Sequence, residues 1–97
     1  MEALLVKPNP LGYYVSMPKV PILGASYRVL VNTNDHSPAH VHVIVGNATV
    51  IVELEKASVI DIRGRVKANE LRRAQALVAE NVDVCRQIWR KVHENQE

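Results

Sequence analysis

The feature that most constrains the fold is a period of two in the apolar residues from 27 to 62, which gives way to a helical period after Gly64. Successive side chains of a strand point to opposite sides, so this alternation predicts strands with one apolar face. The predicted strands cover residues 27–34, 40–45, 48–54 and 57–62. Gly46 and Asn47 separate the second strand from the third, and glycine in the first position favours a type II′ hairpin turn. We therefore expect a four-stranded, mostly antiparallel meander.

After Gly64 the apolar residues recur at intervals of three and four, which traces one stripe along a helix. The stripe consists of Leu71, Ala74, Val78, Val82, Cys85, Trp89 and Val92. Asn69 is a candidate N-cap with Glu70 in the first turn, and Asn81 is a candidate second cap. The pattern fits one long helix or two short helices broken near Glu80. Neither layer can bury an apolar face alone, so the helical layer must cover one face of the sheet and the fold class is α+β.

Ninety-seven residues allow one domain, which we expect over residues 27–97. Residues 1–26 hold four of the five prolines, and they are predicted to form an extended arm with a short edge strand at Tyr13–Met17. No apolar run approaches the ~20 residues that span a bilayer, and the start does not have the pattern of a signal peptide. The single cysteine, Cys85, cannot form an internal disulfide. These features predict a cytoplasmic protein without a membrane partner.

Three of the four histidines lie within the segment Asp35-His36-Ser37-Pro38-Ala39-His40-Val41-His42. His40 and His42 are two residues apart on a predicted strand, so their side chains point the same way from Cα atoms ~6.5 Å apart. Val41 points to the opposite side, where the helix is expected to pack. The two imidazoles are therefore predicted to face away from the core, or to lie at its rim, and to converge on one small target.

Four interpretations of the histidine segment remain open. The histidines can be half-buried sheet residues, with Asp35 shaping a turn. They can bind zinc, nickel or copper through His40 and His42, with His36 or Asp35 as a third ligand. They can act without a cofactor as base and acid in RNA cleavage, with Asp35 fixing a histidine tautomer. The segment can also belong to a non-catalytic module that binds a protein or nucleic acid.

Charge supports the RNA interpretation only weakly, because the net charge is +2. Residues 63–97 hold eight basic and five acidic residues, whereas residues 1–62 hold four and five. The basic half can meet an anionic partner, but such charges also solvate the outer side of a helix. The candidate phosphate-binding residues are Arg28, Arg63, Arg65 and Lys67.

Other side chains are assigned structural roles. Cys85 and Trp89 lie in the apolar stripe and are expected in the core, which makes Cys85 a poor candidate for a nucleophile. His93 is expected to cap the helix terminus. Glu53, Glu55 and Asp61 are expected to solvate strand edges and turns, and an outward Glu53 can also border the histidine face. An exposed edge of the meander can pair with a second copy of the chain, so a homodimer is expected.

The segment Pro38-Ala39-His40-Val41-His42, together with Asp35-His36, Glu70-Leu71 and the late Trp89, resembles a bacterial family of small domains called DhiT-type. Its members are described as toxins of type II toxin–antitoxin pairs. The resemblance begins at Met17 and covers about eighty residues. This chain departs from the family in having Ala39 where many members have a second proline, and Asn81 where many have a histidine.

The resemblance implies a toxin whose partner is a small antitoxin-like protein encoded by an adjacent gene. Its functional centre is then expected at His40 and His42, with Asp35 and His36 as supports, and its target is expected to be RNA. The alternative is a non-catalytic metal-binding or protein-binding module.

Overall fold

The computed structural model describes residues 18–22, 24–32 and 38–94 of the chain. The expected edge strand at Tyr13–Met17 lies outside these ranges, as do Asp35 and His36 of the histidine segment.

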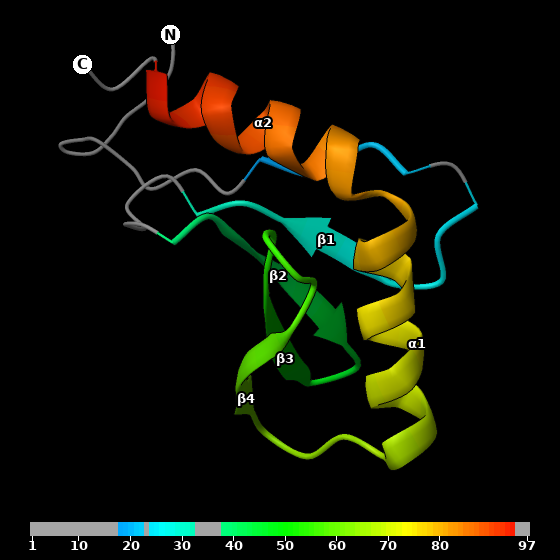
Figure 1. The fold of residues 1–97 in the computed structure, drawn as a ribbon. Coiled ribbons are helices and arrows are strands. Elements are labelled where there is room, and N and C mark those ends of the chain that lie inside the picture. The colour runs from blue at the N-terminus through cyan, green and yellow to red at the C-terminus, as the bar shows by residue number, and fades with distance from the viewer. Residues whose placement is uncertain (1–17, 23, 33–37, 95–97) are drawn as a thin grey trace, which may run out of the picture.

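Four antiparallel strands form one sheet in chain order, which confirms the predicted meander (Figure 1). The strands are β1 (Arg28–Leu30), β2 (His40–Val45), β3 (Ala48–Glu53) and β4 (Val59–Arg63). Gly46 has a φ of 61° and Asn47 is not left-handed, in agreement with the type II′ turn. After Arg63 the sheet ends at Gly64, where the space for a side chain is closed: a Cβ there would lie 3.1 Å from the Cα and Cβ atoms of Ala48.

Two helices follow the sheet, α1 (Ala68–Glu80) and α2 (Val82–Glu94). The N-cap of α1 is Lys67, so the prediction of Asn69 is wrong. Glu70 lies three residues after Lys67, and its carboxylate accepts the Lys67 backbone N–H at 2.9 Å. Asn81 separates the two helices, which confirms the alternative of two helices broken near Glu80; its side-chain amide donates back to the Leu77 carbonyl at 2.8 Å.

The core lies between the helices and one face of the sheet. Val41, Val43 and Val45 of β2 contribute to it, and the alternating valines of β3 and β1 lie on the same side. The helical stripe contributes its central residues, Ala74, Val78 and Cys85, which are fully buried. The other stripe residues pack around them, as the helical period predicted.

The two edges of the sheet differ. Residues 18–20 run along the outer edge of β1: the Val20 N–H donates to the Val29 carbonyl at 2.7 Å, and the Val31 N–H donates to the Pro18 carbonyl at 3.0 Å. β4 forms the opposite edge. In the ranges that the structure describes, no helix is long and apolar enough to cross a membrane.

Candidate functional site

The candidate site lies on the sheet face opposite the valine core. Three cross-strand rows define this face, which we call the outer face. One row pairs His40 with Glu53. The next row contains Leu30, His42, Ile51 and Asp61. The last row contains Arg28, Ile44, Thr49 and Arg63.

His40 and His42 lie together, as their spacing predicted, with ring centroids 5.5 Å apart and ring planes 48° apart. Their exposure differs, because His40 is half-buried whereas His42 is only 5% exposed. Ile51, the neighbour of His42 on β3, is 4% exposed. Strand parity thus assigns the histidines to the correct face but does not reveal that the centre of that face is covered.

A hydrogen bond to the backbone fixes the His40 ring. Its Nδ1 lies 2.7 Å from the Pro38 carbonyl oxygen, which can only accept, so Nδ1 carries a proton. In the neutral ring Nε2 is then the basic nitrogen. The proline two residues before His40 therefore helps to orient the nitrogen that would take up a proton or bind a metal ion.

Helix α2 brings the rings of Trp89 and His93 to the histidine pair, and the sequence predicted neither contact. Trp89 packs against the core, as expected, and its ring also lies 5.3 Å from that of His40. His93 stacks on Trp89 at 3.7 Å, with the planes 25° apart. The His93 Nδ1–H also donates to the Trp89 carbonyl at 2.8 Å, which lies one turn back within α2 and is not one of the terminal carbonyls that a cap would satisfy. The spacing of four residues between Trp89 and His93 places both side chains on one side of a helix, and it was the sequence signal for this stacking.

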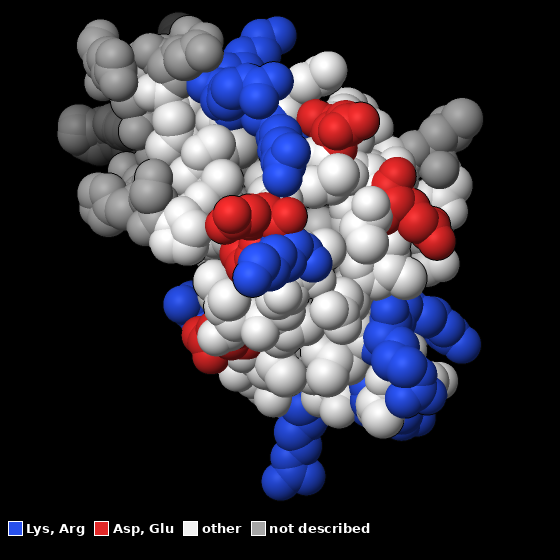
Figure 2. Space-filling view, viewed as in Figure 1, with Lys and Arg blue, Asp and Glu red and all other residues white. Residues whose placement is uncertain are grey.

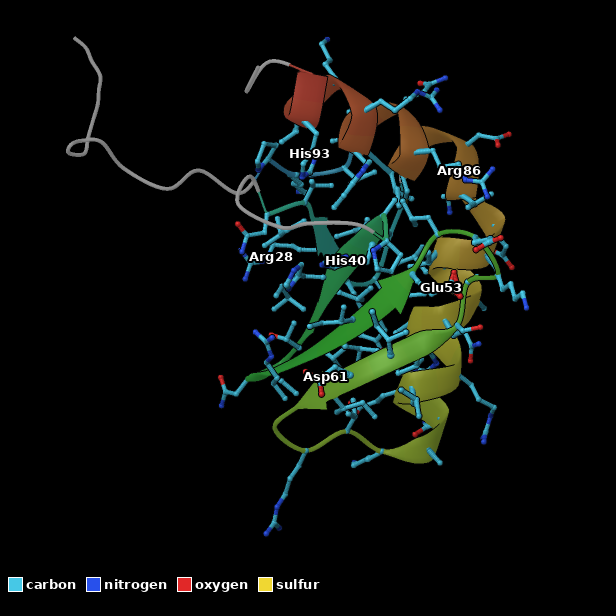
Figure 3. The ribbon with its side chains drawn as sticks, turned by 60° about the vertical axis from the view of Figure 1, so that its left-hand side comes forward. Arg28, His40, Glu53, Asp61, Arg86 and His93 are labelled. Atoms are coloured by element: carbon cyan, nitrogen blue, oxygen red, sulfur yellow. The ribbon has the colours of Figure 1, made fainter. Side chains whose placement is uncertain are left out.

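Glu53 of β3 is the cross-strand partner of His40 of β2, and both are labelled in Figure 3. Its carboxylate accepts the backbone N–H groups of Glu55 at 2.6 Å, Lys56 at 2.7 Å and Ser58 at 3.2 Å. These bonds, that from Lys56 above all, lower the pKa of Glu53 below its usual value and outweigh the opposing effect of desolvation. The row containing His40 therefore holds a carboxylate that stays negative over the whole neutral range.

The four candidate phosphate-binding residues do not form one patch beside His40. Arg28 and Arg63 lie at the two ends of the last row, and the Arg63 Nε is paired with Asp61 at 3.3 Å. Arg65 and Lys67 lie between β4 and α1. On the face shown in Figure 2, basic side chains gather in separate groups with acidic groups between them.

Metal ligands are sparse in the described part of the chain, which contains no group of three His, Cys, Asp or Glu residues able to hold a metal ion. The third ligands suggested by the sequence, His36 or Asp35, lie outside the described residues. Cys85 is fully buried, and burial raises the pKa of its thiol to about 11. Its position agrees with the expected core role.

Comparison with protein-family models identifies residues 26–90 as a domain of unknown function, DUF4160. The chain belongs to this family. The match spans all four strands, α1 and most of α2, and it includes His40, His42 and Trp89. The chain matches no curated protein and no solved structure.

Proposed function

We propose that this DUF4160 protein is the toxin component of a type II toxin–antitoxin pair and that it cleaves RNA without a metal ion, with His40 as the principal proton-transfer residue. The observation that carries the reaction is the pair of imidazoles on the outer face, 5.5 Å apart, with one ring half-exposed and fixed by the backbone. The resemblance to DhiT-type toxins through Pro38, His40 and His42 supports the toxin assignment. Its partner is proposed to be the small antitoxin-like product of an adjacent gene.

In the proposed reaction, Nε2 of His40 takes the proton of a ribose 2′-hydroxyl while that oxygen attacks the adjacent phosphorus. The bond from phosphorus to the 5′-oxygen breaks and a 2′,3′-cyclic phosphate forms. A protonated imidazole then donates a proton to the departing 5′-oxygen. Arg28 and Arg63 are level with Ile44, ~13 Å along the strand from His40, so neither is placed to stabilise the charged phosphorane at this imidazole.

The second imidazole is assigned by burial. His42 is the nearest one, but at 5% exposure it lies behind His40 and acts by holding that ring in place or by passing a proton through it. His93 is half-buried and stacks on Trp89, and His36 precedes Pro38 in the motif. Separate alanine variants of His36, His42 and His93 identify which of them supplies the proton, because only that variant loses cleavage as completely as a His40 variant.

The decisive variant is His40→Asn. The asparagine amide can still donate to the Pro38 carbonyl, but it cannot take up a proton near neutral pH. Induced expression of the wild-type protein is expected to arrest growth, and His40→Asn is expected to abolish the arrest. Ile44→Ala, on the same face of β2 and four residues from His40, is the matched control and is expected to remain toxic.

With purified, untagged protein, RNA cleavage is expected to persist in EDTA, to leave 2′,3′-cyclic phosphate ends and to fall by at least ~100-fold in His40→Asn. Circular dichroism establishes that the variant is folded. Undiminished toxicity or cleavage in folded His40→Asn contradicts the histidine-centred reaction. Absence of growth arrest in the wild type contradicts the toxin assignment.

A metal-binding module is the second candidate, and one observation favours it. Metal-bound histidines commonly donate their other ring N–H to a backbone carbonyl, as His40 does to Pro38. In that case His40, His42 and His36 would hold zinc or nickel through nitrogen ligands. Metal analysis of untagged protein after zinc or nickel supplementation tests this candidate: one equivalent that is lost in His40→Asn supports it, and no retained metal rejects it.

A further inference from the structure

The outer edge of β4 differs from that of β1. Residues 18–20 bond to the outer side of β1, whereas no described segment pairs with the outer side of β4. Ile60 is 50% exposed and Ile62 is 41% exposed, and they are the large apolar side chains exposed among the described residues. An open strand edge with exposed isoleucines is a place where another strand can add.

The hairpin between β2 and β3 determines which backbone groups of β4 point outward. Val45 and Ala48 close a two-residue turn and form a hydrogen-bonded pair, after which bonding alternates along β3. Thr49 and Ile51 therefore bond toward β4, through Arg63 and Asp61. Ile62, between those two residues, directs its N–H and C=O away from β3.

A hydrogen bond supports this assignment. The Ile62 N–H donates to the carboxylate of the preceding residue, Asp61, at 2.9 Å rather than to a strand. The other oxygen of that carboxylate contacts the Arg63 Nε at 3.3 Å. Asp61 and Arg63 share the outer face, with Ile62 between them on the chain. The three residues thus form a short segment with an outward backbone at its centre and opposite charges on either side.

We propose that two copies of the chain associate through β4, antiparallel, about a twofold axis at Ile62. The two Ile62 residues then exchange two N–H···O bonds, in which each N–H leaves the Asp61 carboxylate for the carbonyl of the partner copy. Asp61 of each copy lies opposite Arg63 of the other, so both charge pairs are complementary. The contact is self-complementary and closed, and it joins the two meanders into one eight-stranded sheet.

Other registers are less favourable. An axis at Asp61 would place like charges opposite each other, and the Asp61 backbone is already directed toward β3. An irregularity in the β3–β4 pairing, where Val52 pairs with Val59 and Ile51 with Asp61, leaves Ile60 as the extra residue. This bulge confines regular pairing to a few residues around Ile62. The association is therefore expected to be reversible and dependent on concentration, and it does not depend on the proposed reaction.

Charge reversal tests both the association and its register. Analytical ultracentrifugation of the wild-type protein is expected to show a monomer–dimer equilibrium. Asp61→Arg places arginine opposite arginine and Arg63→Asp places aspartate opposite aspartate, so each variant is expected to dimerise at least ~10-fold more weakly. The double variant is expected to recover the wild-type equilibrium. An equimolar mixture of the two single variants is expected to form a heterodimer. Arg65→Asp, outside the strand, is the control and is expected to behave as the wild type.

Circular dichroism verifies that each variant is folded. A wild-type chain that stays monomeric at millimolar concentration overturns the proposal, as does a dimer that persists unchanged in both single variants. Failure of the mixed variants to associate overturns the register. If the wild-type chain is monomeric but binds the product of the adjacent gene through β4, the edge belongs to a different partner and the self-association is rejected.

Discussion

The two faces of the sheet are built from neighbouring residues of the same strands, but one forms the core and the other carries the candidate site. The core face consists of fully buried valines that pack under α1 and α2. The outer face has charged residues at its margins and His40 and His42 toward one end. Parity along a strand therefore separates residues that specify the fold from residues available for chemistry. The faces differ least at the centre of the outer face, where His42 is nearly as buried as a core residue.

The largest expected effect tests whether the core face excludes reagents. At pH 8 a thiol with a pKa of about 11 is ionised in about one molecule per thousand, against about one in ten at its ordinary value of 9.0. Cys85 in the native protein is therefore expected to react with a disulfide reagent at least ~100-fold more slowly than in urea-unfolded protein. Equal rates in the two conditions would mean that α2 does not cover the sheet.

A pair of adjacent substitutions compares the faces directly. Val43→Ala removes two carbons from the core face and is expected to lower the free energy of unfolding by about 2–3 kcal/mol. Ile44→Ala removes three carbons, but its half-buried side chain lies on the outer face, so its expected cost is smaller. Urea unfolding of both variants measures the difference. A larger loss for Ile44→Ala contradicts the assignment of the faces.

The two histidines sharpen the comparison within the outer face. His42→Ala is expected to cost about 2 kcal/mol because it opens a gap at a covered position, whereas His40→Ala is expected to cost about 1 kcal/mol. Thermal unfolding followed by circular dichroism gives both values. The reverse order would show that the bond from His40 to Pro38 and its contact with Trp89 stabilise the protein more than burial of His42 does.

The smallest effect is expected at Glu53, where the pKa is lowered in the folded protein. A lowered carboxyl pKa stabilises the fold above the unfolded value, and this contribution is lost as the pH falls through the folded value. Glu53→Gln is therefore expected to be less stable than the wild type at pH 7, and the difference is expected to shrink below pH 4.5. Urea unfolding at pH 7 and pH 3 measures it. A difference that does not change with pH argues against a stabilising carboxylate in this turn.

The elements of the fold were accessible from the sequence because alternation and helical spacing are local properties. The choice between one helix and two broken near Glu80 was not, since the apolar stripe continues from Val78 to Val82 without a change of phase. The cap at Lys67 was also missed, because lysine is not a usual N-cap residue and the stabilising group is the Glu70 carboxylate.

The candidate site could be predicted only in part. The spacing of His40 and His42 placed their rings together, since two residues of one strand suffice to determine it. The approach of Trp89 depends on how α2 crosses the sheet, and residues nearly fifty positions apart carry no local signal of their contact. The burial of His42 likewise depends on its surroundings in the folded chain, which parity does not describe.

Trp89 is the single tryptophan of the chain, and its indole lies between the imidazoles of His40 and His93. The tryptophan emission of the protein, excited at wavelengths where its three tyrosines absorb little, therefore originates at the candidate site itself. A nucleotide, a metal ion or a partner that enters there will change this emission, so ligands can be screened with the unlabelled protein.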